Sequence, residues 1–166
     1  MVFDEEVFGK AIGRALTDSR SLRELDISYV TFEHPKSFYD VCSAILNERC
    51  RLNVFKLRGI SITQLEGKIL QYILMKNKTL STMDISHCRA DEPENFEFFL
   101  QKLDQFCNIR YLTIENLQPD ISGSIEVIGE ALSENTKLEA LVLRENKVKW
   151  IPFCSFWNSI ITNRTL

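Results

Sequence analysis

The sequence predicts an α/β solenoid with a parallel β-sheet on its concave face and α-helices on its convex face. Five short apolar segments begin at Leu22, Leu52, Leu80, Ile109 and Leu138, so one unit recurs every 28 to 30 residues. Within each segment apolar residues alternate with period two, and between segments the period changes to about 3.6. This change of period indicates strands that alternate with helices.

The predicted strands share the pattern LxxLxL, with apolar residues in place of some leucines. They lie at residues 22–27, 52–57, 80–85, 109–114 and 138–143. Because side chains alternate across a strand, the apolar positions point to one face and the polar positions to the other. A helix between each pair of strands favours a parallel sheet.

The predicted helices carry apolar stripes at helical spacing, one before the first strand and one after each strand. In chain order the stripes are Val7, Phe8, Ala11, Ile12, Ala15 and Leu16; Phe38, Val41, Cys42, Ile45 and Leu46; Leu65, Ile69, Leu70, Ile73 and Leu74; Phe96, Phe99, Leu100, Leu103 and Phe106; Ile125, Ile128, Ala131 and Leu132; and Phe153, Phe156, Trp157, Ile160 and Ile161.

Such units must stack, because none can bury its own stripe. Strands lie about 4.8 Å apart and helices about 8 to 10 Å apart, which predicts an arc with the strands inside. We expect one domain over residues 1–166, a leading helix followed by about five repeats. Leu166 begins a further LxxLxL segment, so we expect the chain to be truncated at this end. An uncapped terminus of this kind would also allow end-to-end association.

A repeat of 28 to 30 residues that joins LxxLxL to an amphipathic helix resembles the ribonuclease-inhibitor-like class of leucine-rich repeat proteins. The resemblance implies a horseshoe that binds protein partners on its concave sheet. The sequence departs from that class at the ninth motif position, where Asn or Cys is typical. Only Cys88 and Asn146 match there, and the other repeats have Val30, Ile60 and Leu117.

The concave face is predicted from the third, fifth and seventh motif positions. Tyr111 is the first candidate for partner binding, as an exposed aromatic side chain near the middle of the sheet, with Arg58 and Arg144 next. The other partner-binding candidates on this face are Lys56, Asp84, Glu115, Glu24 and Asp26. An alternative interpretation is a solvated mosaic of paired charges, whose pairs contribute only about 0 to 1 kcal/mol each.

No catalytic, metal-binding or cofactor-binding residues are predicted. The chain has no GxxxxGK[ST], GxGxxG, HExxH or GxSxG motif. His87 and Cys88 are adjacent, yet Cys88 fits the structural turn position of the repeat. Residues 91–94 are acidic and precede a helical stripe, which favours helix initiation over a cation site. We therefore expect neither an enzyme nor a bound cofactor.

Composition and charge narrow the remaining classes of function. The net charge is −3 without a basic block, which disfavours nucleic-acid binding. No apolar run approaches the roughly 20 residues of a membrane span, and the amino terminus does not resemble a signal peptide. Five cysteines without a CxxC pair suggest reduced thiols. We expect a cytoplasmic, intracellular protein without membrane insertion.

The leading functional hypothesis is a non-enzymatic scaffold that binds a protein partner through the concave sheet face. One alternative is a regulator of a small GTPase, similar to the Ran-activating leucine-rich repeat proteins. Another is a structural subunit of a cytoskeletal or ciliary assembly, with contacts on the convex helices or the ends. Repeat architecture fixes the shape of a surface but does not identify its partner.

Overall fold

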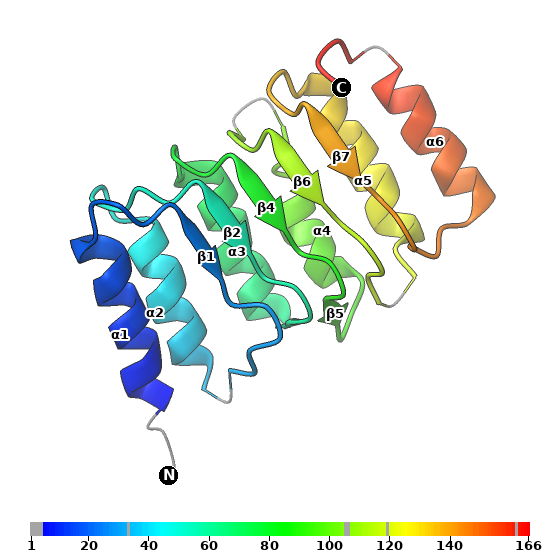
Figure 1. Ribbon diagram of the computed structural model, residues 1–166. Coiled ribbons are helices and arrows are strands. Elements are labelled where there is room, and N and C mark those ends of the chain that lie inside the picture. Colours follow the sequence, from blue (N-terminus) through cyan, green and yellow to red (C-terminus); the bar gives the residue numbers. More distant parts are fainter. Residues whose placement is uncertain (1–4, 33, 105–106, 119, 162) are drawn as a thin grey trace.

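The computed structural model describes residues 5–32, 34–104, 107–118, 120–161 and 163–166, arranged as one sheet and one layer of helices (Figure 1). The sheet has five strands that follow one another in chain order and are all parallel. They are β1 (Glu24–Asp26), β2 (Val54–Lys56), β4 (Thr82–Asp84), β6 (Tyr111–Thr113) and β7 (Ala140–Val142). The sequence therefore predicted the α/β class and the parallel sheet correctly.

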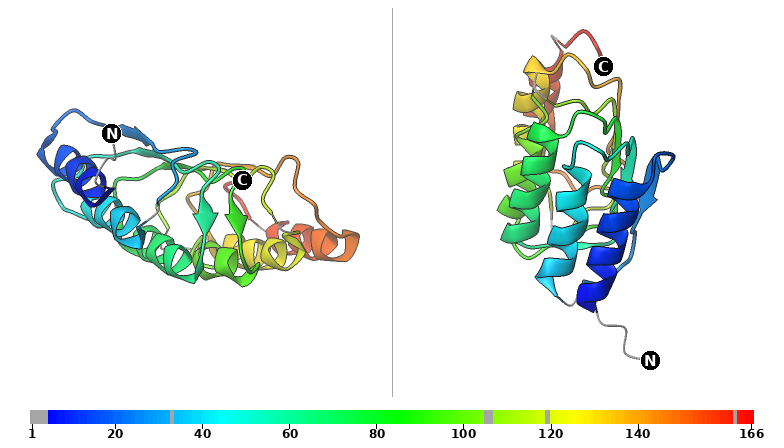
Figure 2. Two further views of the ribbon diagram at one scale, coloured as in Figure 1. Left: turned by 90° about the horizontal axis from the view of Figure 1, so that it is seen from below. Right: turned by 90° about the vertical axis from the view of Figure 1, so that its left-hand side faces the viewer.

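The helices cover one face of this sheet and leave the other face open, as Figure 2 shows from two sides. They are α1 (Glu5–Asp18), α2 (Pro35–Ile45), α3 (Gln64–Lys76), α4 (Glu94–Leu100), α5 (Ser122–Glu134) and α6 (Trp150–Ile160). A second, two-stranded parallel sheet joins β3 (Ser61–Ile62) to β5 (Arg89–Ala90) in the segments that lead from the main sheet to the helices.

The strand register follows the LxxLxL pattern without a shift. Leu25 is paired with Phe55, Phe55 with Met83, Met83 with Leu112, and Leu112 with Leu141. A register slip of one residue would move this apolar row to the open face, so burial of the row holds the register. The repeated spacing in the sequence thus corresponds to one row of side chains across the sheet.

One continuous core lies between the two layers. It combines the strand row, in which Phe55, Met83 and Leu112 are buried, with the predicted stripes of α2 and α5 and most of the stripe of α4. Leu65 on α3 was predicted to be buried and is instead 49% exposed. Phe106, predicted for the stripe that continues from α4, lies outside the described residues.

The stripes of the two outermost helices are only partly buried, which corrects the sequence prediction. Val7 and Phe8 on α1, and Trp157 and Ile161 at α6, are exposed, whereas Leu16 and Phe156 are buried. The reason is position: α1 packs against α2 and α6 packs against α5, so each has a neighbouring helix on one side. Trp150, the first residue of α6, is exposed as well.

Asparagines that follow α3, α5 and α6 connect these helix ends to the preceding unit, and Asn77 and Asn135 are buried. The side-chain amide of Asn77 donates to the carbonyl of Ile45, that of Asn135 to the carbonyl of Leu103, and that of Asn163 to the carbonyl of Leu132. The same side chains accept backbone N–H bonds two and three residues further on. The similarity of residues 77–80, 135–138 and 163–166 in the sequence reflects this shared cap.

The structure supports a two-layer α/β domain and not the finer prediction of a curved solenoid. Each strand in the main sheet is three residues long, and both edge strands, β1 and β7, are open. Within the described part of the chain, no helix is both long enough and apolar enough to cross a lipid bilayer. Association through an uncapped end stays a prediction.

Candidate functional site

The open face of the main sheet carries the predicted site residues, and we call it the sheet face. On this face three ion pairs connect neighbouring strands. Lys56 pairs with Glu24, the guanidinium Nε of Arg58 lies 3.7 Å from Asp84 Oδ2, and Nε of Arg144 lies 3.8 Å from Glu115 Oε1. The structure thus brings six of the eight predicted residues together in pairs, in the arrangement of a charge mosaic.

Tyr111 is 46% exposed on this face, as predicted. Its hydroxyl donates a hydrogen bond of 2.8 Å to Glu139 Oε2, while Nε of Arg110 donates one of 2.7 Å to Glu139 Oε1. Residues 110 and 139 precede β6 and β7, so strand pairing places the two side chains side by side. The phenol ring is therefore held in one orientation before any partner arrives.

This three-residue group changes the ionisation of its members. The hydrogen bond from Arg110 and the bond from Tyr111 lower the pKa of Glu139, because both stabilise the carboxylate. The same bond to Glu139 raises the pKa of Tyr111, because the phenol must give up its proton beside a negative charge. Glu139 is consequently ionised and Tyr111 neutral at physiological pH.

Asp26, the eighth predicted residue, accepts a hydrogen bond from the backbone just beyond its own strand. Its Oδ1 accepts the backbone N–H of Ser28 at 2.9 Å, and bonds from Ser28 lower the pKa of the aspartate. Asp84 accepts the N–H of Ser86 in the same way, also at 2.9 Å. The hydroxyls of Ser28 and Ser86 accept the N–H groups of Arg58 and Glu115 on the next strand. These Asp-x-Ser segments fix the backbone that carries the charged row.

Arg110 and Glu139 are functional candidates that the sequence analysis missed. They occupy the second motif position, which strand alternation places on the buried side of the sheet. The strands begin only at residues 111 and 140, so these two side chains lie before the regular alternation starts. The sequence signal that could have identified them is their opposite charge at equivalent positions of adjacent units.

A second missed feature is a row of residues with left-handed backbone at the end of each strand. Tyr29, Gly59, His87, Asn116 and Glu145 all have φ between 49° and 68°. The Tyr29 ring lies over Gly59, where a Cβ would come within 2.3 Å of the ring carbon Cδ1. The ring centroids of Tyr29 and His87 are 6.4 Å apart, and the Asn116 amide lies 3.2 Å from His87 Nδ1.

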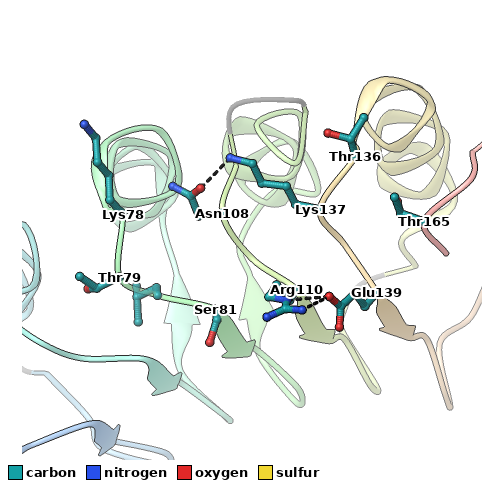
Figure 3. A pocket seen from close by; sticks show the side chains of 10 residues that line it. Lys78, Thr79, Ser81, Asn108, Arg110, Thr136, Lys137, Glu139 and Thr165 are labelled. Atoms are coloured by element: carbon teal, nitrogen blue, oxygen red, sulfur yellow. Dashed lines mark hydrogen bonds and ion pairs between the residues drawn. The ribbon is translucent and has the colours of Figure 1, made fainter.

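A pocket of about 490 Å³ adjoins the Tyr111 group at the amino ends of the strands (Figure 3). Lys78, Asn108, Lys137 and Thr165 line it together with Arg110 and Glu139. The Lys137 ammonium donates to Asn108 Oδ1 at 2.6 Å, so its charge is directed along the rim. The sheet face therefore continues into a recess at this edge.

Side chains suited to metal binding are not grouped in the described residues. No cluster of three or more His, Cys, Asp or Glu side chains that could hold a metal ion occurs there. Cys88 is fully buried and its thiol donates to the carbonyl of Leu57 at 3.1 Å, as its predicted structural role requires. Burial raises the pKa of Cys88 to about 12, which keeps the sulfur protonated and unreactive.

No protein-family model matches the chain. Among solved structures, it is similar to the Leiomodin-1 Actin-Binding Site 2, with a TM-score of 0.73 and 17% identity over 98% of this chain and 90% of that one. It is also similar to the tropomodulin C-terminal domain of Caenorhabditis elegans, with a TM-score of 0.69 and 16% identity over 96% and 93% of the two chains. At these identities the similarity establishes the fold alone.

These similarities contradict the family that the repeat suggested. The domains matched over nearly the whole chain are those of leiomodin and tropomodulin. The assignment to ribonuclease-inhibitor-like leucine-rich repeat proteins is therefore wrong, and so are the leucine-rich repeat and solenoid descriptions. The spacing of the LxxLxL segments reflects the combined length of a strand, a helix and two connections. The apolar pattern within each segment reflects burial of the strand. Any parallel α/β layer built from elements of these lengths shares both properties.

Proposed function

We propose that this protein binds actin through the sheet face and acts as a non-enzymatic cytoskeletal component. The observation that carries the proposal is the similarity to a leiomodin domain described as an actin-binding site, over almost the full length of both chains. The fold alone does not specify a partner, so the surface that this chain presents must also suit one.

The chemistry of the sheet face supports protein binding. Tyr111 presents an aromatic ring that Glu139 already orients, so a partner contacts it at a reduced entropic cost. Aromatic residues and arginines contribute most to protein interfaces, and Arg58 and Arg144 extend from the same face. Their acidic neighbours Asp84 and Glu115 provide alternating charge, which favours one orientation of a charged partner.

The proposal is tested by co-sedimentation of the purified protein with actin filaments, combined with binding measurements on monomeric actin. We expect the wild type to bind at least one of these forms. Simultaneous change of Tyr111→Ala, Arg58→Ala and Arg144→Ala should abolish binding without lowering the melting temperature, because all three side chains contact solvent.

A matched control removes one tyrosine and two cations from the helix layer, as Tyr72→Ala, Arg14→Ala and Lys76→Ala, all of which are exposed. This control should bind actin as the wild type does. Absence of binding by the wild type to both forms of actin would refute actin as the partner. Loss of binding in the control alone would move the interface from the sheet face to the helices.

A further inference from the structure

A second pocket, of about 580 Å³, lies at the opposite end of the molecule from the Tyr111 group. It is formed where the segment after α1 meets the segment after α2, and every residue that lines it is polar. These residues are Thr17, Asp18, Ser19, Arg20, Arg23, Arg49 and Arg51. We call it the arginine pocket, since four guanidinium groups and one carboxylate surround it.

Among the described residues, the four arginines have no carboxylate partners of the kind that cations on the sheet face have. Within the described part of the chain, no ion pair joins Arg20, Arg49 or Arg51 to an acidic side chain, whereas Lys56, Arg58, Arg110 and Arg144 each have one. Arg23 donates through one terminal nitrogen to the carbonyls of Arg20 and Leu22, both at 3.0 Å. Positive charges are therefore concentrated in the arginine pocket, although the net charge of the protein is −3.

Helix dipoles do not account for this gathering. A cation stabilises a helix when it lies within its last turn. Neither α1 nor α2 has a basic residue in its last turn, because Arg20, Arg49 and Arg51 all follow the helix ends at Asp18 and Ile45. The arrangement instead matches an anion site, in which guanidinium forks meet the oxygens of phosphate or carboxylate groups.

We propose that the arginine pocket binds a small polyphosphorylated polyol, of the inositol phosphate type, either free or as the headgroup of a lipid. Four guanidinium groups against Asp18 leave three positive charges, which two phosphate groups of about −1.5 to −2 each would neutralise. The lining contains no aromatic side chain on which a nucleobase would stack. The hydroxyls of Thr17 and Ser19 suit the hydroxyl groups of a polyol.

Ser19 is already oriented for this role. Its Oγ accepts the backbone N–H groups of Ser21 and Leu22 at 3.3 and 3.1 Å, and those two bonds leave the hydroxyl proton for donation to a ligand oxygen. The pocket is distinct from the sheet-face group around Tyr111, so ligand binding here does not depend on the proposed contact with actin.

The test is isothermal titration calorimetry with inositol trisphosphate, and in parallel co-sedimentation with phosphatidylcholine vesicles that contain phosphatidylinositol bisphosphate. Vesicles with phosphatidylserine of equal total charge provide the comparison for nonspecific attraction. Arg49→Gln combined with Arg51→Gln should weaken binding at least about tenfold, because each change removes charge-assisted hydrogen bonds.

The control pair is Lys147→Gln with Lys149→Gln, two exposed cations with the same spacing at the other end of the chain, and it should leave binding unchanged. If the double arginine variant loses its folded circular dichroism spectrum, Arg20→Gln takes its place. Binding to the soluble probe, or to the bisphosphate vesicles only, supports the free or the lipid-borne ligand respectively. No binding in either assay, equal binding to phosphatidylserine vesicles, or equal loss in the lysine control overturns the proposal.

Discussion

Tyr111, Arg110 and Glu139 form one hydrogen-bonded group at the amino ends of β6 and β7. In such a group the properties of each residue depend on its neighbours, because the carboxylate accepts from both partners. Removing either donor should therefore change the acidity of Glu139. The group thus connects the exposed aromatic side chain of Tyr111 to the titratable carboxylate of Glu139.

We expect Arg110→Gln to raise the pKa of Glu139 toward its ordinary value of 4.5. A folded-state pKa below the unfolded value contributes stability that is present above the unfolded pKa and is lost as pH falls through the folded one. NMR titration of the Glu139 carboxyl carbon measures this shift. Lys137→Gln is the control, since that ammonium bonds to Asn108. An unchanged Glu139 pKa in the arginine variant would contradict the assigned bond.

Gly59→Ala should lower the free energy of unfolding by about 1 to 3 kcal/mol, because the residue has φ of +68° and a Cβ would collide with the Tyr29 ring. Adding Tyr29→Ala should recover only the part due to the collision. Gly13→Ala in α1 is the matched control, where a Cβ meets ordinary contacts and the helix gains up to about 1 kcal/mol. Urea denaturation measures all three variants, and equal effects at both glycines would show that backbone conformation is unimportant.

At this scale the sequence predicted which strand residues point toward the helix layer, since alternation depends only on local backbone geometry. It did not predict left-handed backbone at Tyr29, because a bulky side chain is rarely found there. It also missed the helix cap at His34, whose Nδ1 accepts the N–H of Lys36 at 3.2 Å. The Tyr29 conformation accompanies a contact with Gly59 of the next unit, whereas the His34 cap is local and was missed because histidine is not among the preferred N-cap residues.

Among the elements, strands in the middle of the sheet differ from those at its edges. Leu112 in β6 is 2% exposed, whereas Leu141 in the edge strand β7 is only half-buried. The repeated motif gives these two leucines the same position, so the sequence could not distinguish them. The difference reflects how many neighbouring elements cover each side chain. The same reason explains the exposed stripes of α1 and α6.

Leu112→Ala should cost about 2 to 5 kcal/mol of unfolding free energy, because the cavity it leaves is enclosed on all sides. Leu141→Ala should cost clearly less, since the surroundings of an edge strand relax into the space. The midpoint of urea denaturation reports both changes, with an unchanged slope as evidence that the variants unfold by the same transition. A larger loss at Leu141 would mean that β7 is covered in solution.

Across the whole molecule, one core runs from α1 to α6. The period of 28 to 30 residues predicted this arrangement of layers, because the physical requirement to bury each stripe leaves few alternatives. It could not predict the family, since unrelated sequences meet the same requirement. The sequence did not predict the binding partner either. The identity of a partner depends on the exposed residues, and the apolar repeat does not restrict which residues occupy those positions.

We expect the domain to unfold in one cooperative transition. Both tryptophans, Trp150 and Trp157, lie on α6, so their fluorescence reports one end of the molecule, whereas far-ultraviolet circular dichroism reports all helices. The two melting curves should coincide if the core behaves as a single unit. Earlier loss of the fluorescence signal would mean that α6 separates before the remaining layers melt.

The asparagine caps also lie at interfaces that a pulling force would load. Asn77, Asn135 and Asn163 each connect a unit to the one before it. Tension applied between the two ends of the stack loads the interfaces between neighbouring units in series, and at these interfaces the asparagine bonds share the load with strand pairing and core contacts. A domain under such a load yields at its weakest link, whatever its thermal stability.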